Sequence, residues 1–198
     1  MQGFSFLAKG KRSSVYAGTL NDKKVALKIF NQSSDRSFNE AYWLRKLNKV
    51  GIGPKLLSYT KGKIMYEFVD GPLFEDFIKQ DDHPLDLILA ILRQCRQIDR
   101  LKVIKEELQH PQKHIFVVPK RKIVMIDFEN CHASRTPKNL TQCCQYFLSF
   151  RMRHILKKKG INLKKSEMIP LLKAYKDNPT PTTFRKIVLY IRKQTKKN

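Results

Sequence analysis

The chain has 198 residues, of which 41% are hydrophobic and 10% aromatic, so it is long enough to bury a core and is unlike a disordered tail. Its formal net charge is +23, and residues 151–198 hold 15 Lys and Arg against two acidic residues. No run of 18 apolar residues is present, and the apolar N-terminal stretch lacks a small-residue cleavage site. These features argue against a membrane-spanning helix and a cleaved leader, and we expect a cytoplasmic protein without a membrane partner.

The first seventy residues are predicted to form a β-sheet with one helix. Residues 33–53 begin with Ser and Asp, which are typical of helix caps, and end near Gly51, so we expect about four turns of helix there. An Asn-Asp-Lys-Lys turn signal separates the first strand-like stretches. Runs rich in β-branched and aromatic residues predict strands on both sides of the helix, over 4–20, 23–30, 54–60 and 63–69.

Helices are predicted to predominate after the Asp-Gly-Pro segment at 70–72. This segment is the expected boundary between residues 1–70 and residues 71–198. Leu, Ile and Cys residues recur at steps of three and four between 84 and 101, which predicts an amphipathic helix. A Pro-Lys-Arg-Lys turn joins two apolar runs into a hairpin over 115–126. Further helices are predicted over 139–160, 165–179 and 182–197.

The basic C-terminal region and the cysteines each leave two interpretations open. Residues 151–198 could dock a polyanion such as RNA or a ribonucleoprotein by counterion release, or they could form a lysine-rich solvated face. The four cysteines show no C-x-x-C spacing, which argues against a disulfide framework and a zinc ribbon. Cys131-His132 and Cys143-Cys144 leave a zinc site as the lesser alternative to buried thiols.

One lysine is predicted to lie inside the sheet. In the stretch VALKIF, residues 25–30, strand alternation places Lys28 among apolar neighbours. Burying a lone ammonium is costly, so Lys28 needs a partner. Glu40 is the candidate, because it lies one and two helical turns before Leu44 and Leu47 and shares their inward face. The alternative is an edge-strand lysine and an exposed glutamate, both in solvent.

The hairpin ends in a polar sequence, IDFEN. Asp127 and Phe128 match the start of a metal-holding Asp-Phe-Gly motif, with Glu129 in place of the glycine. A second motif, IMYEFVDGP at residues 64–72, is similar to the hinge segment that contacts adenine in nucleotide-binding enzymes. Many buried strands followed by Gly-Pro have the same pattern, so the hinge assignment depends on the other motifs.

The order of these elements and residues resembles the protein-kinase fold over about residues 4–150. More narrowly, the chain is similar to the small archaeal predicted serine/threonine protein kinases, which are related to the RIO and KEOPS-associated atypical kinases. The resemblance implies an α+β, two-lobed fold. Its N-lobe, residues 1–70, would hold a small antiparallel sheet with one helix, and its C-lobe, residues 71–198, would be mainly helical. It also implies ATP, Mg²⁺ and phosphoryl transfer.

The resemblance assigns one group of residues to the nucleotide. Lys28 would grip the α- and β-phosphates, and Glu40 would orient Lys28. The Gly-rich loop matches residues 8–15, where only Gly10 of the three glycines is kept, and basic neighbours add positive charge. Backbone groups of the hinge would contact adenine. The residues expected around ATP are therefore Gly10, Ser13, Val15, Ala26, Lys28, Glu67, Val69 and His114.

The expected catalytic loop, H-R-D-x-x-x-x-N, departs from its pattern in this chain. Counting back from Asp127 puts His114 at the Asn position and Gln109 at the catalytic Asp. Gln109 cannot take a proton, so His110 or Glu107 would supply the base, unless His110 only shapes a turn. Asp127 would hold the metal with His114, whose nitrogen suits Mn²⁺ better than Mg²⁺. The expected catalytic set is Lys28, Glu40, Gln109, His110 and Asp127.

These features predict an atypical ATP-dependent kinase that phosphorylates a serine or threonine on itself or on another protein. The substitutions in the catalytic loop favour a different hypothesis, a pseudokinase that binds nucleotide or RNA without turnover. Two further hypotheses are a small-molecule or RNA kinase and a plain RNA-binding protein that uses its C-terminal helices. The sequence does not identify the phosphoryl acceptor.

Overall fold

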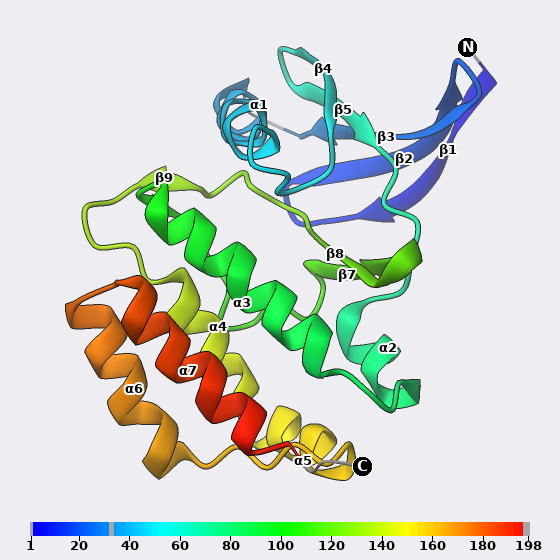
Figure 1. Ribbon diagram of the computed structural model, residues 1–198. Helices are drawn as coiled ribbons and strands as arrows, with labels where there is room; N and C mark the ends of the chain where they lie inside the picture. Colours follow the sequence, from blue (N-terminus) through cyan, green and yellow to red (C-terminus); the bar gives the residue numbers. More distant parts are fainter. Residues whose placement is uncertain (1, 32–33, 196–198) are drawn as a thin grey trace.

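A computed structural model describes residues 2–31 and 34–195 of the chain. Within them it has an α+β architecture, with one five-stranded antiparallel sheet and seven α-helices (Figure 1). The sheet and helix α1 (Ser34–Asn48) occupy one end of the structure in Figure 1, and the C-terminal helices, yellow to red, occupy the other. The hairpin of β7 (Ile115–Val118) and β8 (Lys122–Met125) lies between them.

The five-stranded sheet places Lys28 at its centre. Lys28 pairs with Val15 on one neighbouring strand and with Ile64 on the other. The predicted alternation is confirmed, because Ala26, Lys28 and Phe30 are all buried. The strands, in their order across the sheet, are β1 (Gln2–Lys9), β2 (Ser13–Leu20), β3 (Lys23–Phe30), β5 (Lys63–Glu67) and β4 (Leu56–Thr60).

Helix α1 packs against this sheet through its inward face. Leu44 and Leu47 are fully buried, and Glu40 is 2% exposed on the same face, as the sequence predicted. The chain then leaves the helix through Gly51, whose φ of 72° is the left-handed conformation that glycine adopts without strain. Residue 33, where the predicted helix began, lies outside the described residues.

The helical half follows the predicted order with one clear correction. Residues 139–160, predicted as one helix, form two, because Ser149 is extended and its side chain accepts a hydrogen bond from the Met152 N–H, which caps a new helix. The apolar periodicity continues through this break, so it did not predict that the helix ends there. A short helix within 71–83 was not predicted. The helices are α2 (Phe74–Gln80), α3 (Leu85–Arg100), α4 (Asn139–Phe147), α5 (Phe150–Lys158), α6 (Lys165–Asp177) and α7 (Pro181–Lys193).

Two short strand pairs connect the halves. The β7-β8 hairpin is present as predicted. It lies so close to Gly71 that a Cβ there would be 2.1 Å from the Val117 carbonyl oxygen, which only glycine avoids. Sequence reasoning missed the second pair, β6 (Val103–Ile104) with β9 (His132–Ala133), because its strands have two residues each. This second pair ties the segment before Glu107 to the segment after Asp127.

The structure also bears on the membrane and cysteine predictions. Over residues 2–31 and 34–195, none of the helices has the length and apolar character needed to cross a bilayer. All four cysteines are free thiols in the core, and burial raises the pKa of Cys131 to about 12. The groups of potential metal ligands found in the described residues contain no cysteine, so the zinc alternative has no structural support.

Candidate functional site

Lys28 lies at the centre of a buried cluster of charges. Its Nζ atom is 2.7 Å from Glu40 Oε2, 3.1 Å from Asp127 Oδ1 and 3.1 Å from Glu129 Oε2. These side chains come from β3, α1 and the segment after β8. Burial alone would disfavour the ammonium, but the surrounding carboxylates raise the pKa of Lys28, so it carries a positive charge. The contact expected between Lys28 and Glu40 is therefore present, with two further carboxylates around it.

Hydrogen bonds join helix α1 to the segment after β8. The second oxygen of Glu40 accepts a hydrogen bond from the Phe128 N–H at 3.3 Å. The side-chain amide of the preceding residue, Asn39, donates to the carbonyl oxygens of Glu129 and Cys131, at 2.8 and 2.9 Å. These bonds fix the helix that carries Glu40 against the segment that carries Asp127, so the cluster is held from both sides.

Asp127 is held in an uncommon backbone conformation. Its φ is 67°, the left-handed region that residues other than glycine rarely adopt outside functional sites and turns. Lys105, which is 1% exposed, donates from Nζ to the Asp127 carbonyl oxygen at 2.6 Å. Burial by itself would raise the pKa of Asp127, but the ammonium groups of Lys28 and Lys105 outweigh it and lower that pKa. Asp127 is therefore a carboxylate with a fixed direction.

The other oxygen of Asp127 faces His114. His114 Nε2 is 3.6 Å from Asp127 Oδ2, and its Nδ1 is 3.8 Å from Glu107 Oε2. The Nδ1 atom is buried and has no hydrogen-bond partner. Burial and the positive charge of Lys105 lower the pKa of His114, so its imidazole is neutral at pH 7. Glu107, like Asp127, has a left-handed backbone, with a φ of 71°.

These three side chains form a plausible ligand set for an ion. Ligand atoms of Glu107, His114 and Asp127 lie within 4.8 Å of one another. A neutral imidazole and two carboxylates are a donor set that Mn²⁺ and other first-row ions accept, whereas Mg²⁺ prefers oxygen alone. A second group of that kind, Glu40 with Asp127 and Glu129, encloses the Lys28 ammonium instead.

A buried polar network supports the loop that carries Glu107. Asn139 Oδ1 accepts the Lys105 N–H at 2.7 Å, and its Nδ2 donates to the Val103 carbonyl at 2.7 Å. Asp99 accepts from that same Nδ2 at 2.7 Å and from the Tyr175 hydroxyl at 3.1 Å. Residues of α3, α4 and α6 thus fix the start of the loop. Sequence reasoning missed Lys105 and this network, because no local pattern marks them.

Two residues of the predicted catalytic set lie elsewhere. Gln109 is exposed and lines a cavity with residues of α4 and α6, among them Thr141 and Leu172. His110 is also exposed, and its N–H closes a turn onto the Glu107 carbonyl at 2.9 Å. The carboxylate that faces His114 belongs instead to Glu107. Glu107 lies two positions before Gln109 in the sequence, so counting back from Asp127 along the H-R-D-x-x-x-x-N pattern does not lead to it.

The Gly-rich segment meets the charge cluster through Glu129. The Gly10 N–H donates to the Ser13 carbonyl at 2.8 Å, which makes a tight turn. Arg12 in this turn lies 3.6 Å from Glu129 Oε1, and Arg36 of α1 lies 3.8 Å from the same atom. Glu129 is 8% exposed. The residue that replaces the motif's glycine therefore lies among three cations, one of which is Lys28.

Only some of the residues expected to contact adenine lie near Lys28. Val15 and Ala26 lie on β2 and β3, beside Lys28 in the sheet. The Glu67 N–H already donates to the Lys55 carbonyl at 2.9 Å, so that group is not available to a base. Glu67 and Val69 line a cavity of about 510 Å³ whose other walls come from the α1–β4 connection and the β7-β8 hairpin, not from Lys28.

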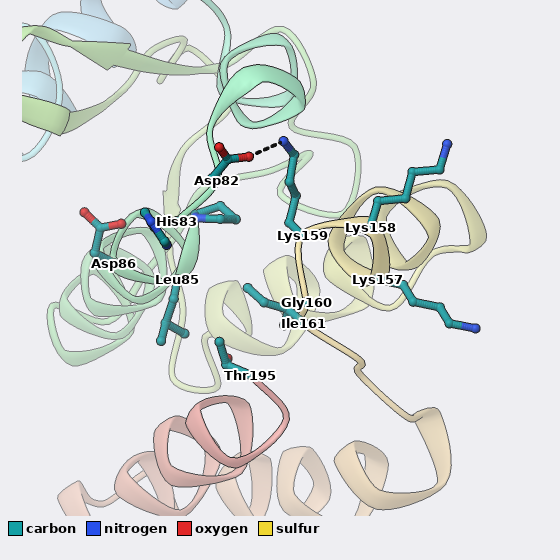
Figure 2. A pocket seen from close by; sticks show the side chains of 11 residues that line it. Asp82, His83, Leu85, Asp86, Lys157, Lys158, Lys159, Gly160, Ile161 and Thr195 are labelled. Carbon is teal, nitrogen blue, oxygen red and sulfur yellow. Dashed lines mark hydrogen bonds and ion pairs between the residues drawn. The ribbon is translucent and has the colours of Figure 1, made fainter. Parts of the chain in front are cut away.

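A larger cavity, of about 810 Å³, does not have Asp127 in its lining; Figure 2 shows the residues that line it. It is lined by Lys157, Lys158 and Lys159 at the end of α5 and by the acidic connection between α2 and α3. Lys159 Nζ is 3.2 Å from Asp82 Oδ1, the contact drawn as a dashed line in Figure 2. Part of the positive charge in residues 151–195 is therefore already neutralised there.

No family model matches the chain, and no curated protein matches it.

Proposed function

We propose that the chain is an atypical ATP-dependent kinase that transfers the γ-phosphoryl group to a serine or threonine of a protein, itself or a partner. One observation carries the proposal: the Lys28 ammonium contacts both Glu40 and Asp127, which is 99 positions away in the sequence. Phosphoryl transfer depends mainly on positioning and charge stabilisation, and a fixed lysine beside a fixed carboxylate suits it. The antiparallel sheet followed by helices supports a two-lobed, kinase-like interpretation of the fold.

The residues present fit a metal and a nucleotide. The clustering of ligand atoms from Glu107, His114 and Asp127 is the observation that supports a metal, with Asp127 and His114 as its ligands. ATP, when bound, supplies the phosphoryl group, and the metal supplies charge neutralisation. Lys28 would hold the α- and β-phosphates, and Glu40 would keep Lys28 directed at them. The turn at Gly10 and Ser13 would approach the phosphates through its backbone.

Glu107 is the proposed general base in place of Gln109 and His110. Its carboxylate is 3.8 Å from His114 and its side chain is 53% exposed, so an acceptor hydroxyl could reach it. His114 would then keep Glu107 and Asp127 apart while binding the metal through Nε2. We also propose that the protein is located in the cytoplasm and that residues 151–198 dock RNA or a ribonucleoprotein. Residues 196–198 lie outside the described residues.

Transfer of radiolabelled phosphate from ATP tests this proposal. Wild-type protein with Mn²⁺ or Mg²⁺ is expected to label itself or added protein, and Asp127→Ala is expected to abolish labelling. Asp70→Ala is the matched control, because Asp70 is exposed and pairs with the exposed Lys24. Glu107→Gln is expected to lower the labelling rate by about 10²–10⁴-fold while metal binding persists. Labelling that survives Asp127→Ala would contradict the proposal.

A pseudokinase is the second candidate, and Glu129 is the observation that favours it. The Glu129 carboxylate already pairs with three cations, Lys28, Arg12 and Arg36. Without it, these cations would be available to bind a phosphate. Under this alternative, ATP with metal raises the thermal unfolding temperature of the wild type and not of Lys28→Ala, yet no phosphate is transferred. Measuring binding and labelling on the same preparation separates the two candidates.

A further inference from the structure

A stripe of aromatic and basic side chains covers the outer face of α1. Phe38, Tyr42 and Lys46 follow one another at steps of four residues, so they share a face of the helix, and the exposed Lys49 comes directly after its last residue. Leu44 and its neighbours on the opposite face are buried. Phe38 is 59% exposed and Tyr42 is 38% exposed, although aromatic rings usually gain free energy from burial. The stripe therefore leaves much of its aromatic surface exposed to solvent.

The rings in this stripe are organised rather than scattered. Phe38 and Tyr42 are stacked, with centroids 6.2 Å apart and planes inclined by 26°. Tyr59 of β4 meets Phe38 edge-on at 6.2 Å. The Lys46 ammonium lies 4.3 Å from the centroid of the Tyr42 ring and contacts its hydroxyl. An aromatic platform with a cation held over it is the arrangement that binds stacked, negatively charged ligands.

The charge around the stripe has one sign. Residues 34–63 contain seven Lys and Arg and two acidic residues. One of the two, Glu40, is 2% exposed and paired with Lys28 on the inner side of the helix. The other, Asp35, lies at the far end of the helix from Lys46 and Lys49. The surface that carries the rings is therefore cationic as well as aromatic.

We propose that this α1-β4 surface, formed by Phe38, Tyr42, Lys46, Lys49 and Tyr59, binds single-stranded nucleic acid. Unpaired bases stack on exposed aromatic rings, and the phosphates between them are attracted by lysine side chains. A duplex hides its base faces, and an acidic peptide would make no use of the rings. The surface lies at the opposite end of the structure from α5 and α7 in Figure 1, so it is distinct from the basic C-terminal region. The inference does not depend on the proposed kinase activity.

The test measures binding of a labelled single-stranded oligonucleotide of about 12 residues by fluorescence anisotropy. Oligo(U) and oligo(dT) arms separate RNA from DNA. Phe38→Ala combined with Tyr42→Ala is expected to weaken binding by at least about five-fold, because each stacked base contributes about 1–3 kcal/mol. Lys46→Ala with Lys49→Ala is expected to flatten the salt dependence by about one unit of slope.

Phe150→Ala is the matched control. Phe150 is 83% exposed on α5, so the same substitution removes an exposed phenylalanine from the other basic region. The proposal is supported if Phe150→Ala and Phe38→Tyr bind the oligonucleotide with wild-type affinity and Phe38→Ala binds it more weakly. Equal losses in Phe38→Ala and Phe150→Ala, or competition by polyglutamate at the same charge concentration as the oligonucleotide, would overturn it. Circular dichroism verifies that each variant is folded.

Discussion

The two carboxylate oxygens of Asp127 face different surroundings. Oδ1 lies 3.1 Å from the Lys28 ammonium, whose other neighbours, Glu40 and Glu129, are at 2.7 and 3.1 Å. Oδ2 lies 3.6 Å from His114, which in turn is 3.8 Å from Glu107. The first side is a closed cluster at hydrogen-bond distances. On the second side the polar atoms face one another at distances longer than hydrogen bonds.

The difference shows how one carboxylate can serve two purposes. On the lysine side, the protein supplies its own cation, so the contacts hold β3, α1 and the segment after β8 together. On the histidine side, the separations suit donors that share an ion at about 2.0–2.2 Å from each. We therefore expect substitutions on the lysine side to act mainly on stability and those on the histidine side to act mainly on metal binding.

The largest expected effect is that of Lys28→Ala on stability. The substitution removes the cation that pairs with the buried Glu40 and Glu129 and with the partly exposed Asp127, and removing one partner of a buried ion pair costs about 3–5 kcal/mol. Urea denaturation measures the free energy of unfolding. Lys24→Ala, on the same strand, is the control, since Lys24 is 70% exposed and should lose less than about 1 kcal/mol. Similar losses in the two variants would show that the cluster does not stabilise the fold.

Lys105→Ala is expected to have the next largest effect. It removes a charged hydrogen bond to the Asp127 carbonyl and should lower the free energy of unfolding by about 1.5–3 kcal/mol. Because this bond holds the left-handed backbone of Asp127, metal affinity should fall as well. Lys113→Ala, an exposed lysine of the same loop, serves as the comparison. Unchanged metal affinity in Lys105→Ala would mean that Asp127 keeps its orientation without the hydrogen bond from Lys105.

His114→Ala tests the other side of Asp127. Mn²⁺ affinity, measured by titration calorimetry without nucleotide, is expected to fall by at least about 10-fold, with little change in unfolding free energy. His110→Ala changes an exposed histidine four residues earlier and is expected to leave Mn²⁺ affinity unchanged. A loss in His110→Ala as large as that in His114→Ala would restore the role that the sequence suggested for His110.

The smallest expected effect is a gain. Glu129→Gln removes the extra carboxylate beside Lys28, so ATP phosphates should bind about 10-fold more tightly, equivalent to about 1.4 kcal/mol. Calorimetry with Mg²⁺ and ATP measures this change, and Glu106→Gln, a half-buried neighbour of Glu107, is the control. Weaker ATP binding in Glu129→Gln would instead mean that Glu129 positions Arg12 and Arg36 for the nucleotide.

Part of the site was predictable because its signals are local. Lys28 in an apolar strand and Glu40 on an apolar helix face each violate the expected pattern, and a buried charge requires a partner. Asp127 was singled out because it follows a hairpin and begins a sequence similar to Asp-Phe-Gly. Counting along the loop did not show that Gln109 lines a cavity with residues of α4 and α6. Lys105 was missed because nothing near it in the sequence shows that its side chain reaches the Asp127 carbonyl.

The sequence by itself determined most of the longer elements, their order and the inward direction of Lys28 and Glu40, because strand and helix periodicity depend on neighbours a few residues apart. Only the tertiary structure decided which acid faces His114, which cation holds Asp127, and where the predicted helix over 139–160 breaks. The contacts that hold Asp127 join residues 22 and 99 positions apart, Lys105 with Asp127 and Lys28 with Asp127. Local periodicity carries no information about such contacts, since they form only when the halves of the chain pack together.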